Sequence, residues 1–131
     1  MIVGTWRLFS PPQDEDSEHR DETVKTQGKA GEDFTVEEAY EAARVSGINI
    51  LSTVRNTLGT LDRVVRLVRT FGMVNAVPDF GQHPQVINGF SDFMVEVFGE
   101  DLGKGTRAAV GMGSLPFGMA VEIETYWEIR A

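Results

Sequence analysis

Residues 105–130, GTRAAVGMGSLPFGMAVEIETYWEIR, decide the fold of this chain because they combine two strand patterns with the turn between them. The second pattern places Val121 and Ile123 on one parity and Glu122 and Glu124 on the other. Successive side chains of a strand point to opposite faces, so the apolar set is expected on a buried face and the carboxylates on the other. The stretch therefore predicts the last strands of a sheet that is covered on one side.

Two more strands are expected upstream. Residues 1–9 are apolar and β-prone, and the segment ends at a serine and two prolines. Residues 61–77 alternate in part, which places Val64 and Val74 on one face and Leu67 on the other with further apolar residues. Apolar residues on both faces are typical of a central strand that is covered on both sides. In so short a chain, we expect the second cover to come from another subunit.

Two helices are expected between these strands. Residues 34–59 repeat apolar positions near the helical period, Thr35 and Glu38 have the spacing of a capping box, and Gly59 is a natural C-terminal stop. Residues 77–101 carry an amphipathic stripe of aliphatic and aromatic residues, with a proline suited to the first turn.

The element order is therefore strand, helix, strand, helix, strand, strand. This order predicts an α+β fold in which a mixed β-sheet carries two helices on one face. The chain of 131 residues is expected to form one domain, residues 1–131.

Composition limits the possible functions. The chain has no cysteine, which excludes disulfides, thiolate catalysis and Cys-based zinc sites, and His19 and His83 lie too far apart to suggest a metal site. The net charge of −8 argues against a nucleic-acid partner. No apolar run approaches the roughly 20 residues that span a bilayer, and no secretory signal pattern is present. We expect a cytoplasmic protein with no metal, no cofactor, and no membrane or nucleic-acid partner.

Residues 11–33 hold eight acidic and three basic residues, so most of the net negative charge is concentrated there. Such a composition is typical of a solvated segment, and we interpret residues 11–33 as a mobile acidic loop.

Arg107 has two readings on the residues alone. It could pair with a glutamate across neighbouring strands, since opposite charges stabilise cross-strand pairs. It could instead hold a small carboxylate, because a guanidinium binds a carboxylate through two parallel hydrogen bonds.

The motif that distinguishes these readings is Arg107, then Leu115-Pro116, then Glu122-Ile123-Glu124. With the helices before it, this spacing resembles the RidA/YjgF superfamily, also called the endoribonuclease L-PSP family, in the branch with a chorismate-mutase-like fold. The resemblance covers residues 34–129, about three quarters of the chain.

The resemblance implies a homotrimer with a barrel-like core of sheets, helices outside, and ligand clefts between subunits. It implies an enzyme that hydrolyses reactive 2-imino or enamine acids to 2-keto acids and ammonia, without a cofactor. Arg107 would bind the substrate carboxylate and Glu122 would act as the catalytic residue that orients water. Gly4, Thr5 and Ala109 would fall in the substrate-binding cleft.

The pocket departs from the family pattern at two places. Val3-Gly4 stands where relatives have Ser-Gly, with Thr5 as a shifted hydroxyl, and Ala109 stands where many relatives have cysteine. These changes favour the alternative of a trimer that binds 2-keto acids without converting them. An endoribonuclease activity follows only from the family label, and the acidic charge argues against it.

Overall fold

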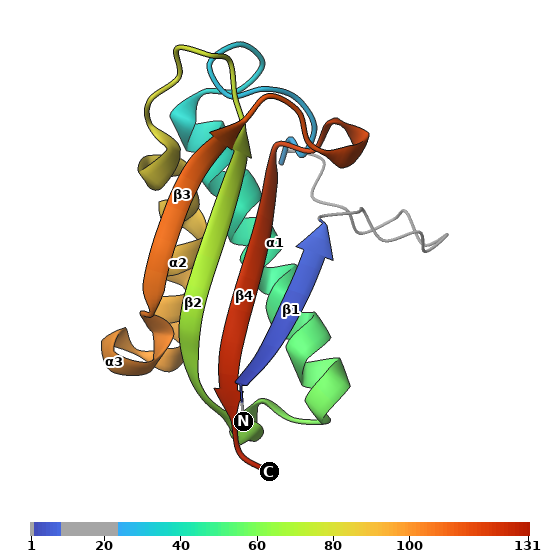
Figure 1. Ribbon diagram of the computed structural model, residues 1–131, viewed down its shortest axis with the longest axis vertical. Coiled ribbons are helices and arrows are strands. Elements are labelled where there is room, and N and C mark those ends of the chain that lie inside the picture. The colour runs from blue at the N-terminus through green and yellow to red at the C-terminus, as the bar shows by residue number, and fades with distance from the viewer. Residues whose placement is uncertain (1, 9–23) are drawn as a thin grey trace.

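The computed structural model of this chain describes residues 2–8, by their backbone, and residues 24–131. Its four-stranded sheet comprises β1 (Ile2–Leu8), β2 (Val64–Asn75), β3 (Thr106–Met112) and β4 (Val121–Ile129). The strand order is β1-β4-β2-β3, with β2 and β3 parallel and the other neighbours antiparallel (Figure 1). The sheet is therefore mixed, as predicted.

Two long helices, α1 (Val36–Leu58) and α2 (His83–Phe98), lie behind the sheet in Figure 1. Their apolar stripes bury against one sheet face, so the predicted α+β arrangement with two helices on one face is confirmed. A short α3 (Glu100–Gly103) and two 3-10 turns, η2 (Leu61–Arg63) and η3 (Pro116–Gly118), were not predicted. We call the sheet face opposite the helices the open face.

The ends of α1 confirm the capping prediction. The Thr35 hydroxyl accepts a hydrogen bond from the Glu38 backbone N–H at 3.1 Å, and the Glu38 carboxylate accepts one from the Thr35 N–H at 3.2 Å. Gly59 ends the helix with a φ of 84°, a left-handed conformation that glycine adopts without steric cost.

Two glycines allow α2 to approach its neighbours closely. A Cβ at Gly89 would lie 2.0 Å from the Tyr40 carbonyl oxygen on α1. A Cβ at Gly72 of β2 would lie 2.6 Å from a side-chain carbon of Ile87 on α2. Both distances are far below van der Waals contact, so these contacts fix α2 against the helix and against the sheet.

The predicted placement of Leu67 and Val74 on opposite faces of β2 is wrong. Register shifts occur between Val64 and Arg66 and again between Leu67 and Arg69. A bulge adds a residue and reverses the parity that follows it. As a result Leu67 pairs with buried Trp127 on the helix face, although alternation had separated it from Val74.

Strands β3 and β4 are not neighbours, because β2 lies between them. They run antiparallel but share no hydrogen bonds, so the reading of Arg107 as a direct cross-strand partner of a β4 glutamate is wrong. The chain crosses over β2 through the loop that contains η3 (Figure 1).

Residues 24–33 also differ from the expected mobile loop. Gln27 forms a bridge with Met119, Ala30 forms one with Ala76, and the Ala30 N–H donates to the Asn75 carbonyl at 2.8 Å. Ala30 is buried in the core. Ala30 therefore holds this part of the acidic segment against the end of β2. Residues 11–23 lie outside the described part.

Candidate functional site

Arg107 lies on the edge strand β3, with its side chain directed toward α2. Its Nη1 donates hydrogen bonds to Asn88 Oδ1 at 2.8 Å and to Ser91 Oγ at 3.1 Å. These bonds occupy one nitrogen of the guanidinium, which has five N–H donors in all. Among the described residues, no carboxylate lies within ion-pair distance of Arg107. Asn88 Oδ1 and Ser91 Oγ are therefore uncharged acceptors, and no described carboxylate neutralises the charge of Arg107.

A cavity of about 460 Å³ surrounds Arg107 between β3 and α2. It lies within the size range of small-molecule sites. Its lining residues come from β2, α2 and the turn before β3: Leu67, Thr70, Asn88, Ser91, Asp92, Val95, Gly103, Lys104, Gly105 and Arg107. We call this space the Arg107 cavity.

Other charged groups of the Arg107 cavity already have partners. Asp92 accepts a hydrogen bond of 2.7 Å from the Tyr40 hydroxyl, and this bond is the main reason that the pKa of Tyr40 is raised. Lys104 donates to Glu100 at 2.8 Å, which raises the pKa of Lys104. Arg107 therefore remains the cation of this cavity without a carboxylate partner in the described chain.

Glu122 lies on the open face of β4. Burial is the first reason that its pKa is raised, and the charge of Glu124, two residues along the same face, is the second. The hydroxyl of Tyr126, next on this face, is hydrogen-bonded to Glu124, and that bond raises the pKa of Tyr126. A carboxylate with a raised pKa is a stronger base once it is ionised, which suits a water-activating role.

Arg107 and Glu122 are not brought together within one chain. Arg107 pairs with Thr70, which pairs in turn with buried Thr125 on the helix face. Glu122 pairs with Met73, three residues further along β2, and therefore faces the other way.

The remaining predicted residues are divided between the two edges of the sheet. Ala109 shares the helix face of β3 with Arg107 and packs on the core. Gly4 and Thr5 pair with Tyr126 and Thr125, so their backbone lies on β1, at the opposite edge. One chain thus places Ala109 on the same strand face as Arg107 and leaves Gly4 and Thr5 on β1, with β4 and β2 between them.

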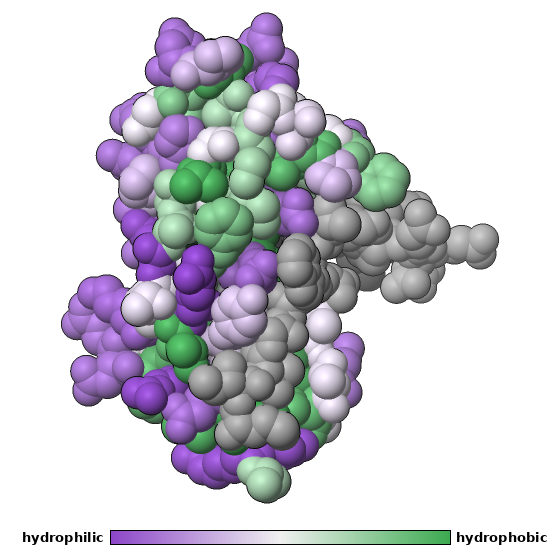
Figure 2. Space-filling model, viewed as in Figure 1, coloured by the Kyte–Doolittle hydropathy of each residue, from purple (hydrophilic) through white to green (hydrophobic). Residues whose placement is uncertain are grey.

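The open face carries an apolar patch near the carboxyl ends of β2 and β3. Met73, Leu115 and Met119 are buried there, and Phe71 and Met112 pack against them. Figure 2, which views this face, shows apolar side chains gathered over its upper half and polar ones below. Glu122 pairs with Met73 and so borders this patch.

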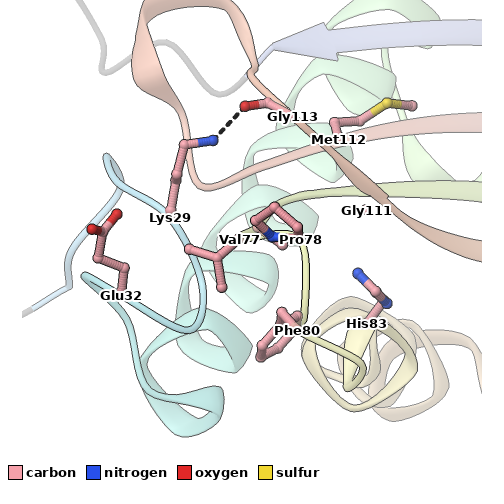
Figure 3. Close-up of a pocket in the computed structure, with 10 residues that line it drawn as sticks. Lys29, Glu32, Val77, Pro78, Phe80, His83, Gly111, Met112 and Gly113 are labelled. Carbon is pink, nitrogen blue, oxygen red and sulfur yellow. Dashed lines mark hydrogen bonds between the residues drawn. The ribbon is translucent and has the colours of Figure 1, made fainter.

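A second cavity, of about 710 Å³, lies beyond the ends of β2 and β3 (Figure 3). Lys29, Phe80, His83 and Met112 line it, together with the loop after β2. His83, the first residue of α2, is half-buried in this wall. Gly111 leaves room for the His83 ring, since a Cβ there would lie 2.5 Å from His83 Nε2.

Neither a metal site nor a membrane helix is found in the described residues. Over 2–8 and 24–131, no three His, Cys, Asp or Glu side chains form a group that could hold a metal ion. Within the same ranges, no helix is long and apolar enough to cross a bilayer.

Comparison with known proteins gives a consistent result. Residues 17–123 match the model of the family described as "YjgF/chorismate mutase-like, putative endoribonuclease". Protein TCP17 of Trypanosoma cruzi is 42% identical over 103 residues, covering 79% of this chain and 64% of that protein. The chain thus spans less than two thirds of this curated relative.

Solved structures share the fold. The protein Atu1372 of Agrobacterium tumefaciens, of unknown function, is 38% identical, with a TM-score of 0.80 over 86% of this chain and 72% of that chain. A structure from Shewanella oneidensis described as a "putative endoribonuclease" has a TM-score of 0.78 over 98% of this chain and 78% of that one, and at 23% identity it shares the fold alone. The structure of Escherichia coli TdcF with bound serine, at 19% identity and a TM-score of 0.50 over 82% and 78%, shares the fold alone.

Proposed function

Because this chain belongs to the YjgF/chorismate mutase-like family, we propose that it binds a small 2-imino acid through Arg107 and hydrolyses it. Water adds to the carbon of the C=N bond, and the C–N bond then breaks. The products are a 2-keto acid and ammonia, so atoms balance without a redox partner.

The observation that carries this proposal is the unpaired charge of Arg107 within a cavity. Its described hydrogen bonds use Nη1 alone, which leaves Nε and Nη2, the edge that grips a carboxylate through two bonds. Asn88 and Ser91 hold the guanidinium in place, so little side-chain entropy is lost when a carboxylate binds.

The chemical step requires a base. Asp92, the carboxylate of the Arg107 cavity, already accepts a hydrogen bond from the Tyr40 hydroxyl, so we assign this role to another residue. Glu122 has the raised pKa that the role favours, but it lies on the open face. We therefore place the reaction between copies of this chain, where Glu122 of one copy approaches Arg107 of another. The exposed side chain of Val110, which pairs with Met73 on this face, supports such an assembly, since burying it would stabilise a homotrimer or another closed oligomer.

A second candidate is a protein that binds 2-keto acids without converting them. The separation of Arg107 from Glu122 within one chain favours it, because a carboxylate can bind to Arg107 without any contribution from Glu122.

A coupled assay tests the proposal. An amino-acid oxidase produces a 2-imino acid in the presence of semicarbazide, and the protein should lower semicarbazone formation by removing the imine. Calorimetry with pyruvate and 2-oxobutyrate measures binding separately. Binding without imine removal would establish the second candidate. The absence of both binding and imine removal would refute both candidates.

A further inference from the structure

The cavity lined by Lys29, Phe80 and His83 occupies the end of a β-α-β unit. Strands β2 and β3 are parallel neighbours, and α2 connects them, so the carboxyl ends of both strands and the first turn of α2 meet at one place (Figure 1). In open sheets with parallel strands, this is where ligands bind. The cavity of about 710 Å³ lies there, and it is large enough for a molecule of ten or so heavy atoms.

Lys29 provides a cation in this cavity. Its Nζ donates to Asn75 Oδ1 at 3.0 Å and to the Gly113 carbonyl oxygen (Figure 3). Both acceptors are neutral, and no carboxylate of the described residues is within ion-pair distance of Lys29. An ammonium has three N–H donors, so one donor and the full charge remain for a ligand.

Asn75 fixes the position of the Lys29 side chain. Asn75 is buried, and its Nδ2 donates to the Met119 carbonyl at 3.1 Å, which leaves Oδ1 directed to the ammonium. Asn75 thus orients Lys29 in the way that a supporting residue orients a binding group.

The opposite wall is apolar and aromatic. The His83 ring meets Phe80 edge-on, with centroids 5.2 Å apart, and lies over Gly111. Val77 and Met112 complete this wall, and Figure 3 shows it facing Lys29 across the cavity. Glu32 lines the cavity on the side of Lys29, and its charge disfavours a ligand with a second negative charge.

From this arrangement we propose that the cavity binds a monocarboxylate with an aromatic or branched apolar body. The carboxylate pairs with Lys29, and the body packs on Val77, Phe80 and Met112. This site is distinct from the Arg107 cavity, since the two cavities share no lining residue. It also goes beyond the imine chemistry proposed above and does not depend on it.

Indole-3-acetate and its neutral analogue indole-3-acetamide test the site in the full-length chain. In a titration followed by NMR, indole-3-acetate should shift the amide signals of Val77, His83, Gly111 and Gly113. The acetamide, which lacks the charge, should bind about ten-fold more weakly, the factor expected for losing one hydrogen bond to a charged group. Inorganic phosphate should leave these signals unchanged.

Two variants test whether Lys29 binds the carboxylate, apart from any effect on folding. Lys29→Met should weaken the binding of indole-3-acetate about ten-fold and leave the binding of the acetamide unchanged. Lys104→Met, the matched change at the Arg107 cavity, should change the binding of neither compound. If Lys29→Met does not fold, Gly111→Ala replaces it, since its Cβ pushes His83 into the cavity and should weaken both indoles. Three outcomes would overturn the proposal: NMR shifts confined to Ser91 and Gly105, equal affinity for the acid and the amide, or no shifts at millimolar ligand.

Discussion

Arg107 and Glu122 point to opposite faces of one sheet, because their partners on β2, Thr70 and Met73, are three positions apart along the strand. A substrate held by Arg107 is therefore out of reach of Glu122 in the same chain. Catalysis that uses both residues must take place between two copies.

This arrangement predicts complementation between inactive variants. Arg107→Lys and Glu122→Gln should each remove imine hydrolysis when assayed alone. Mixed in equal amounts after dissociation and reassembly, they should recover about a quarter of the wild-type activity, because about one site in four joins an intact Arg107 to an intact Glu122. The semicarbazone assay measures the recovery. No recovery from mixed, correctly assembled oligomers would show that both residues act within one chain or that Glu122 has no catalytic role.

Replacing Arg107 with lysine should weaken 2-keto acid binding by about 1.5–3 kcal/mol, since the charge remains and the two-bond geometry is lost. Calorimetry with pyruvate measures this change. The melting temperature should hardly change, because Arg107 is exposed and forms no ion pair with the described residues. Arg66→Lys is the matched control: Arg66 is exposed, pairs with Glu128 at 2.7 Å, and should leave pyruvate binding intact. Equal losses in the two variants would remove the special role of Arg107.

Glu122 should make stability depend on pH. Its pKa is raised above the ordinary 4.5 by burial and by Glu124, so the folded protein favours the protonated form. The folded state therefore gains stability from this group below pH 4.5 and loses it as the pH rises through the raised pKa. Glu122→Gln should accordingly raise the melting temperature at pH 7 and have little effect at pH 4.

Glu124→Gln is the companion measurement for the same carboxylate. It removes the neighbouring charge, so the pKa of Glu122 should fall and the acid limb of any imine hydrolysis should move to lower pH. A melting temperature that falls with Glu122→Gln at pH 7 would show instead that the ionised carboxylate has a stabilising partner.

The packing of α1 against α2 depends on Gly89. Gly89→Ala places a methyl group 2.0 Å from the Tyr40 carbonyl oxygen, which forces the helices apart, and unfolding in urea should show a loss of about 1–3 kcal/mol. Gly81→Ala is the control, since no atom lies within 4 Å of its Cβ position. Similar stability of the two variants would contradict the close approach of the helices.

Local patterns allowed much of this fold to be predicted. Features that depend on a few adjacent residues can be predicted from the sequence. They include the capping box at Thr35, the helix end at Gly59 and the alternation along β4. The bulges in β2 are not, because a bulge arises from the fit between two strands and not from one segment.

The residues of the candidate site were proposed from the sequence, whereas their arrangement comes from the structure. Arg107 was found from its spacing to the Leu-Pro turn, but its relation to Glu122 depends on β2 lying between β3 and β4. A turn between two strands suggests a hairpin, and only the strand order excludes it. The cavity at Lys29 and His83 was missed because it joins residues from three distant segments, with no local motif.

The contact between Gly72 and Ile87 also restricts how this lineage can change. Any side chain at position 72 would occupy the space of Ile87, so a mutation there is tolerated only after position 87 has become smaller. The two sites should therefore vary together among descendants of a common ancestor, and the order of substitutions is fixed: the helix residue must shrink before the strand residue can grow.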